Sequence, residues 1–403
     1  MTLPIATMSI YLDHNATTPL DSRVREAMLP FFDAAYANPS SQHRAGRAAR
    51  DAIETARAQV AALVEADPGE VIFTSGGTEA NNLAVKGVAA AAKKGRLLYS
   101  GIEHPCVLEP MKALAAWGWA VETIAVDSEG RVDVAAFERQ LSGGDVRLAS
   151  CMIANNETGV IQDTAQLSRL ARRAGAVFHA DAVQAAGKIP VSFPASGAQL
   201  MSLSSHKIYG PKGAGALIAD RSVPLEPLLH GGGQEKNLRG GTENLAAIAG
   251  FGVAAELARA ELETRHAHLQ RLRDRLQARL ADLPGIAMFG IHANRLPNTL
   301  QFAVPGVHSA TLLGLLDKKG FAVSSGSACA SGTDEPSHVL LAMGVAPELA
   351  LCAIRVSLGK DNSEAEVDRF ATTLRELLAG LGVAMPSVLR TARSPDAVRR
   401  YPE

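Results

Sequence analysis

The sequence predicts an α/β protein with a large domain built on a mainly parallel sheet and a smaller α+β domain. Three observations support this prediction. The chain has 403 residues, more than a single hydrophobic core usually serves. Short apolar segments in its middle part alternate with helix-like segments, as in a parallel sheet with crossover helices. After one long helical stretch the apolar segments become shorter, which indicates the second domain.

Four short apolar segments are predicted strands, and each is followed by polar residues. The predicted strands lie at 71–73, 97–99, 148–153 and 177–178. The polar clusters follow at 74–79, 103–105, 155–157 and 181. Ligands of open α/β sheets bind at the carboxyl ends of the strands, so we expect these clusters to converge on one site.

The second half of the chain changes character. Residues 245–283 are rich in Ala, Leu, Arg and Glu and predict one long helix, or two in series, that bridges the domains. Predicted strands at 298–304 and 321–324 and predicted helices at 337–343 and 363–381 follow it. We assign residues 15–260 to the large domain, 1–14 and 261–385 to the small domain, and 386–403 to a loosely ordered tail.

Charge and composition exclude several classes of protein. The chain carries 40 basic and 41 acidic residues and a net charge of -1, which argues against nucleic acids or anionic membranes as partners. It contains neither a leader-like N-terminus nor a run of about 20 apolar residues, so the cytoplasm is the expected location. The four cysteines, 106, 151, 329 and 352, form no C-x-x-C pair. They predict no disulfide framework and no metal site, and any special cysteine is expected to be a reactive thiol.

Lys207 is the first candidate for chemistry. It follows an apolar segment and stands beside Ser205, His206 and a Gly/Pro-rich turn at 210–213. Burial lowers the pKa of a lysine amine, and an uncharged amine can form a Schiff base with an aldehyde. The alternative is an ordinary surface lysine at a turn.

Asp181 ends the apolar segment 176–180, with Gln184 close behind it. A carboxylate at the mouth of a sheet needs a cationic partner once it is buried. The protonated ring nitrogen of pyridoxal phosphate would be such a partner, because that charge makes the cofactor an electron sink. A helix N-cap aspartate is the alternative.

Several residues offer donors to a phosphate. Gly77 and Thr78 stand where a predicted strand meets a helix, whose free backbone amides attract anions. Ser204 and His206 could add donors, and Thr242 after two glycines is a second candidate. Simple turn chemistry is the alternative for each segment.

Three further residues could act on a bound ligand. His104, between a predicted strand and Pro105, could stack on a cofactor ring or move a proton, or it could be a loop histidine. Cys329 lies among small residues that predict a mobile, accessible loop, whereas Cys106, Cys151 and Cys352 lie among apolar residues and are expected to be structural. Arg355 lies in a strand-like apolar run, where it could bind a substrate carboxylate or form a structural ion pair.

Taken together, these segments resemble the pyridoxal-phosphate-dependent cysteine desulfurases, which supply sulfur for iron–sulfur cluster assembly, within the class V aminotransferase-like enzymes. The resemblance runs from Tyr11 to about Glu366. Its most specific motifs are residues 11–18 (YLDHNATT), 38–41 (NPSS), 155–159 (NNETG), 179–184 (HADAVQ), 205–213 (SHKIYGPKG) and the loop around Cys329.

The resemblance implies a type I pyridoxal-phosphate transferase fold, like that of aspartate aminotransferase, and a role for each candidate. Lys207 would carry the cofactor as a Schiff base, Asp181 would pair with its ring nitrogen and His104 would stack on the ring. The remaining cofactor contacts would come from Asn156 and Gln184 at the ring and its phenolic oxygen, from Gly77, Thr78, Ser204 and His206 at the phosphate, and from Thr242 of the partner subunit in a homodimer. Arg355, with Asn38, would bind the substrate carboxylate.

The implied reaction converts L-cysteine to L-alanine. Lys207 or His104 would move the Cα proton, and Cys329 would take the sulfur as a persulfide and pass it to an acceptor or cluster scaffold protein. The Cys329 motif resembles the branch with a long, flexible catalytic loop, but residues 386–403 do not resemble the scaffold-binding segment of housekeeping members. Alternatives are a selenocysteine lyase or another aminotransferase-like enzyme, a non-catalytic sulfur-carrier partner, and a zinc enzyme using His104 and Cys106.

Overall fold

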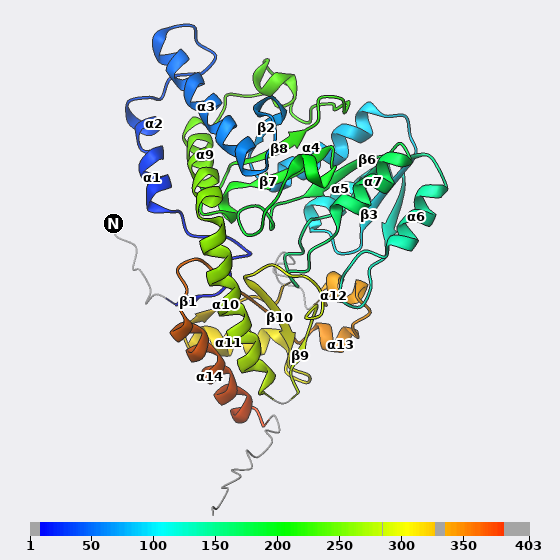
Figure 1. Cartoon of the computed structure of the whole chain (residues 1–403), viewed down its shortest axis with the longest axis vertical. Helices are drawn as coiled ribbons and strands as arrows, with labels where there is room; N and C mark the ends of the chain where they lie inside the picture. Colours follow the sequence, from blue (N-terminus) through cyan, green and yellow to red (C-terminus); the bar gives the residue numbers. More distant parts are fainter. Residues whose placement is uncertain (1–8, 284, 327–334, 383–403) are drawn as a thin grey trace, which may run out of the picture.

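The computed structural model describes residues 9–283, 285–326 and 335–382. A seven-stranded sheet with strand order β2-β8-β7-β6-β5-β3-β4 forms its larger part (Figure 1). The strands are β2 Val71–Thr74, β3 Arg96–Ser100, β4 Ala120–Ile124, β5 Val146–Ser150, β6 Val177–Asp181, β7 Leu200–Ser204 and β8 Gly215–Ala219. Only β8 runs antiparallel to its neighbours, so the predicted mainly parallel sheet is confirmed.

Helices bury both faces of this sheet. On one face, Phe73 and Phe178 share a core with Phe251. On the other face, Ile72 packs in a core with Leu83. Successive strand residues point to opposite faces, so a strand covered on both sides is apolar throughout. The covering helices are α3 Arg44–Leu63, α4 Gly77–Ala91, α5 Pro105–Ala116, α6 Val134–Ser142, α7 Thr164–Arg173 and α9 Leu245–Ala260.

The strand predicted at 148–153 is shifted in the structure and ends at Ser150. The chain beyond it still bonds to β6, because the N–H groups of Cys151 and Ile153 donate to the carbonyls of His179 and Asp181 at 3.0 and 2.8 Å. Residues 151–153 are buried without being a strand. Their apolar character therefore reflects burial under the edge of the sheet.

The predicted long helical stretch forms two helices in series. α9 and α10 (Leu262–Ala281) meet at Glu261, whose carboxylate accepts hydrogen bonds from Arg265. In Figure 1 the two helices run from the seven-stranded sheet to the smaller part of the molecule. They therefore carry the chain from one part to the other.

The smaller part holds the C-terminal elements and the first strand. Its three-stranded antiparallel sheet has the order β12-β10-β9, and β1 pairs in parallel with β11. Phe302, Phe321 and Phe370 lie in its own core. The elements are β1 Ile10–Tyr11, β9 Ala287–Met288, β10 Thr299–Ala303, α11 Ser309–Lys318, β11 Phe321–Ala322, α12 His338–Ala342, β12 Ala353–Ser357 and α14 Glu364–Gly380.

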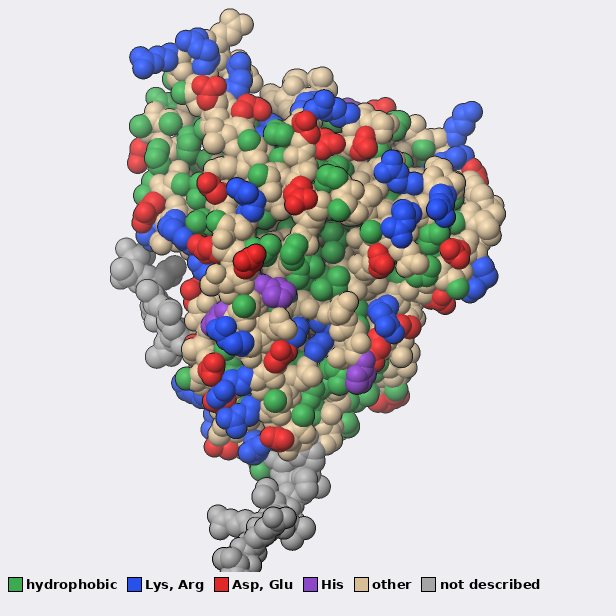
Figure 2. All heavy atoms as spheres, viewed as in Figure 1, with side chains coloured by type: hydrophobic (Ala, Val, Ile, Leu, Met, Phe, Trp, Pro, Cys, Tyr) green, Lys and Arg blue, Asp and Glu red, His purple; other side chains and the backbone are tan. Residues whose placement is uncertain are grey.

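Short elements complete the described chain: α1 Ser22–Met28, α2 Pro30–Asp33, η1 Pro68–Glu70, α8 Phe193–Ser196, η2 Ser205–Lys207, η3 Gln234–Asn237 and α13 Pro347–Ala350. On the face shown in Figure 2, acidic and basic side chains are interspersed. Among the described helices, none combines the length and apolarity that crossing a membrane requires.

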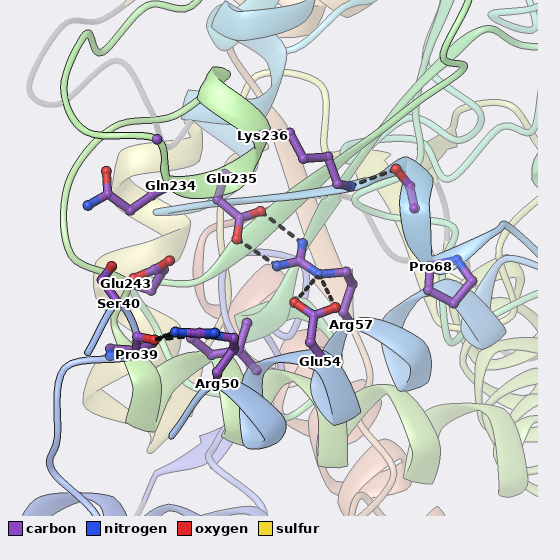
Figure 3. A pocket seen from close by; sticks show the side chains of 13 residues that line it. Pro39, Ser40, Arg50, Glu54, Arg57, Pro68, Gln234, Glu235, Lys236 and Glu243 are labelled. Carbon is purple, nitrogen blue, oxygen red and sulfur yellow. Dashed lines mark hydrogen bonds and ion pairs between the residues drawn. The ribbon is translucent and has the colours of Figure 1, made fainter. Parts of the chain in front are cut away.

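A buried ion pair ties α3 to η3 (Figure 3). The Arg57 guanidinium donates to both carboxylate oxygens of Glu235 at 2.7 and 2.9 Å, and the two side chains are 7% and 2% exposed. Arg57 also donates to the Val71 carbonyl at 3.0 Å, and the Phe73 N–H donates to Glu235 at 2.7 Å. The pair therefore fastens the segment that precedes Thr242 onto the edge strand β2.

Replacing Arg57 with methionine should lower the free energy of unfolding by about 3–5 kcal/mol, because the Glu235 carboxylate stays buried without its cation. Urea unfolding followed by fluorescence measures the change. Arg221→Met is the matched control, since Arg221 and Asp67 pair with side chains 70% and 59% exposed. The control should lose less than about 1 kcal/mol. Equal losses in the two variants would contradict the role of the buried pair.

Candidate active site

A cavity of about 250 Å³ lies at the carboxyl ends of β6 and β7, against the N-terminus of α4. Its lining residues are Ala16, Gly77, Thr78, Asn81, His104, Cys106, Met152, Asn156, Asp181, Val183, Gln184, Ser204, His206 and Lys207. Every predicted cofactor-binding residue except Thr242 is among them. The parallel strands bring these residues together because their carboxyl ends share one edge of the sheet.

Lys207 closes η2, directly after β7. Its side chain is half-buried and its Nζ donates to the carbonyls of Asn15 at 2.5 Å and Ala16 at 2.8 Å. Two backbone carbonyls therefore hold the amine at the cavity wall. This placement differs from that of an ordinary surface lysine.

Asp181 is the last residue of β6 and is 4% exposed. One carboxylate oxygen accepts from the Asn81 amide at 2.7 Å and the other from the Val183 N–H at 2.9 Å. Burial raises the pKa of Asp181, and these hydrogen bonds and Lys207 lower it in part. Asp181 caps no described helix. A buried carboxylate in a cavity wall favours a cationic ligand.

Donors for an anion converge beside α4. This helix begins at Gly77, and a Cβ there would lie 2.8 Å from a Val183 methyl, so only glycine fits. The Ser204 hydroxyl is buried and has no hydrogen-bond partner among the described residues. His206 contacts the Thr17 hydroxyl at 3.0 Å. Free amides of a helix start and an unpaired hydroxyl together suit a phosphate group.

His104 caps the start of α5. Its Nδ1 accepts the Cys106 N–H at 3.2 Å, which leaves the ring proton on Nε2. Burial, with Lys207 nearby, lowers the pKa of His104 to about 4. His104 is therefore neutral near pH 7.

Cys106 corrects the prediction that it is only structural. It is half-buried and lines the cavity, with its sulfur 2.9 Å from His104 Nδ1 and 2.9 Å from the Asn81 amide. Burial raises the pKa of its thiol well above the usual value, so the thiol stays protonated. The sequence did not predict this position, because Cys106 has apolar neighbours in the chain. Consecutive residues in the first turn of α5 point to different sides, so these neighbours do not share its surroundings. Cys151 and Cys352 are buried as predicted.

Asn15, Asn81 and Lys188 are site residues that the sequence prediction missed. Asn15 is 1% exposed and accepts from Gln184 and Lys207 through its carbonyl. Asn15 belongs to the motif at 11–18, and this was the one feature of the sequence that could have indicated its place at the site. Asn81 bonds to Asp181 from the second turn of α4, a contact that only the packing of α4 on β6 creates.

Arg355, Asn38 and Thr242 lie outside the residues that line the cavity. Arg355 is buried in β12 and forms an ion pair with Asp13 at 2.6 Å, which is the structural alternative stated above. It also donates to the Asn156 carbonyl at 3.1 Å, while its Nε has no partner among the described residues. Asn38 is exposed and accepts the Ser40 N–H at 2.8 Å. Thr242 is also exposed.

Cys329 lies outside the described residues. The described residues on either side of this segment meet at Glu157, next to Asn156 of the cavity. The Ser337 hydroxyl donates to Glu157 at 2.6 Å, and a Cβ on Gly326 would lie 2.9 Å from the same carboxylate oxygen. Gly326 and Ser337 therefore both lie against Glu157, one residue along the chain from Asn156 of the cavity.

The cavity meets the chemical requirements of pyridoxal phosphate. The cofactor needs an amine for its aldehyde, an anion for its ring nitrogen and donors for its phosphate. Lys207, Asp181 and the start of α4 with Ser204 supply these groups. The hollow in Figure 3 is larger, at about 500 Å³, and both basic and acidic side chains line it. Two of them, Arg57 and Glu235, form the buried ion pair described above.

Comparisons with known proteins show the family of the chain. The family model described as Aminotransferase class-V matches residues 10–370. A protein of Gluconacetobacter diazotrophicus named cysteine desulfurase is 44% identical over 386 residues, covering 94% of this chain and 95% of the relative.

Two solved structures are also similar. One, titled NifS-like protein, has a TM-score of 0.86 and 39% identity, covering 93% of this chain and 100% of its own. Another, titled SspA in complex with cysteine, has a TM-score of 0.76 and 32% identity, with 87% and 99% covered. The chain belongs to the class V aminotransferase family.

Proposed function

We propose that this protein is a pyridoxal-phosphate-dependent cysteine desulfurase that converts L-cysteine to L-alanine and transfers the sulfur to Cys329. The observation that carries this proposal is the cavity that combines the Lys207 amine, the Asp181 carboxylate and the N-terminus of α4. The relative named cysteine desulfurase and the similar structure with bound cysteine support the choice of substrate.

The cavity residues would hold the cofactor as the sequence predicts. Lys207 would bind the aldehyde, Asp181 would keep the ring nitrogen protonated and His104 would contact the ring. Thr78, Ser204 and His206 would bind the phosphate, joined by Thr242 of a second copy in a homodimer. When bound, pyridoxal phosphate withdraws electrons from the Cα of the attached amino acid.

The chain's own residues then move the proton. The Lys207 amine would take the Cα proton of the substrate. His104, the alternative base, is neutral near pH 7 but weakly basic because burial lowers its pKa to about 4, so Lys207 is the favoured base. Arg355, with Asn38, binds the substrate carboxylate. The Arg355 guanidinium also pairs with Asp13, so only its other N–H groups remain to bind the substrate carboxylate.

Cys329 takes the sulfur. Its thiolate attacks the sulfur of the bound cysteine, so an S–S bond forms while the C–S bond breaks. The electron pair of the C–S bond stays with the carbon, and protonation gives L-alanine. The enzyme keeps the sulfur as a persulfide until an acceptor protein or thiol removes it. We propose that this sulfur serves iron–sulfur cluster assembly, with the cytoplasm as the expected compartment.

Cys329→Ala should abolish sulfide and alanine release from L-cysteine while the protein keeps its cofactor absorbance. Product assays with a reductant and the visible spectrum measure both properties. Cys352→Ala is the control, because Cys352 is buried away from the cavity and should leave activity near the parent level. Full activity of Cys329→Ala would contradict the proposed acceptor and favour a selenocysteine lyase.

Asp181→Asn should retain the cofactor on Lys207 but lose at least about 10²-fold in alanine formation, because a neutral amide no longer stabilises the charged ring nitrogen. Steady-state kinetics at saturating cofactor tests this. Asp133→Asn, at the N-cap of α6, is the matched control, since asparagine caps a helix as well as aspartate. Unchanged turnover in Asp181→Asn would show that Asp181 does not serve the ring nitrogen.

A further inference from the structure

Lys188 is buried next to the cavity without lining it. It is 6% exposed and follows Gly187, whose φ of 73° belongs to the left-handed region. A Cβ on Gly187 would lie 2.8 Å from a methyl of Ile208, so the turn requires glycine. The turn directs the Lys188 amine inward, where Nζ lies 2.6 Å from Gln184 Oε1 and 3.1 Å from Asn15 Oδ1.

The surroundings of Lys188 favour an uncharged amine. Among the described residues it has no ion-pair partner, and the charged groups that act on it, Lys207 and Arg355, are cationic. Burial first, and then these two charges, lower the pKa of Lys188 well below its usual value. Burial lowers the pKa values of the nearby His14 and His206 to about 4, so neither ring is charged near pH 7. The two acceptors match the two N–H bonds of a neutral amine.

Lys188 and Asn15 together determine how the Gln184 amide is oriented. The Asn15 carbonyl can only accept, so the group 3.0 Å from it must be the Gln184 nitrogen. The Gln184 oxygen then faces the Lys188 amine, which donates to it. The Gln184 nitrogen carries a second N–H, and Gln184 lines the cavity. The amide therefore presents a donor, rather than an acceptor, to a ligand.

We propose that Lys188 is a positioning residue that holds the Gln184 amide with its nitrogen toward the cofactor. The proposal rests on the proposed function, in which Gln184 contacts the phenolic oxygen of pyridoxal phosphate. Without Lys188, the Gln184 oxygen loses its donor and only the Asn15 carbonyl still holds the amide, so the Gln184 nitrogen is held less firmly toward that anionic oxygen. Lys188 thus acts on the cofactor without touching it.

The test is a spectrophotometric titration of the holoenzyme. A donor to the phenolic oxygen stabilises its anionic form and thereby lowers the pKa of the Schiff base with Lys207. Lys188→Met should raise that pKa by about one pH unit, the size expected for one lost hydrogen bond. Gln184→Met should raise it similarly. The double variant should show no further rise, because both substitutions remove the same contact.

Two more variants separate positioning from other causes. Lys188→Gln keeps a neutral donor and should restore a pKa near the parent value. Lys318→Met removes an exposed lysine of α11 and should leave the pKa unchanged. If Lys188→Met is insoluble, the Schiff-base pKa of Lys188→Gln is the test. The proposal would be overturned if that pKa were as high as in Gln184→Met.

The outcomes also separate this proposal from the proposed function. An unshifted pKa in folded, yellow Lys188→Met overturns the positioning role and leaves the desulfurase proposal intact. Additive shifts in the double variant would overturn it too, because Lys188 would then act independently of Gln184. A parent protein that binds no pyridoxal phosphate would instead overturn the proposed function.

Discussion

The hydrogen-bond network centred on Asn15 is the interaction on which the rest of the site depends. Asn15 lies where the seven-stranded sheet meets the small sheet, and its side chain bonds to Thr299 of β10 and to the Asn156 carbonyl. Its backbone N–H donates to Ser357 of β12, and its carbonyl accepts from Gln184 and Lys207. Every one of these polar groups is satisfied, and such networks favour one arrangement of a buried core.

Burial determines the electrostatics of the cavity. Asp181 is a buried carboxylate, and Glu103 behind it has a pKa raised well above its usual value by burial and by Asp181. Burial leaves His104 and His206 neutral as well. Asp181 therefore faces uncharged neighbours and the Lys207 amine. A ligand with a cationic ring and an anionic tail complements this arrangement, since buried charges require partners.

The strands and the principal site residues could be predicted because both depend on local patterns. An apolar strand followed by polar residues places a side chain at the sheet edge, which located Asp181, Lys207 and His104. The same reasoning misjudged Cys106 and extended one strand to residue 153, because apolar neighbours indicate burial without specifying which cavity or sheet the residues face. The sequence prediction missed Lys188, because the sequence does not show whether a lysine is buried or exposed.

The sequence by itself determined the mainly parallel sheet, the long helical stretch at 245–283 and the set of residue types that suit pyridoxal phosphate. These properties follow from hydrophobic periodicity and from turn residues near one another in the chain. Only the tertiary structure decided that Asp13 pairs with Arg355, that Asn81 bonds to Asp181 and that Lys188 bonds to Gln184. Most of these partners lie far apart in the chain, and their contacts arise from packing that no local pattern encodes.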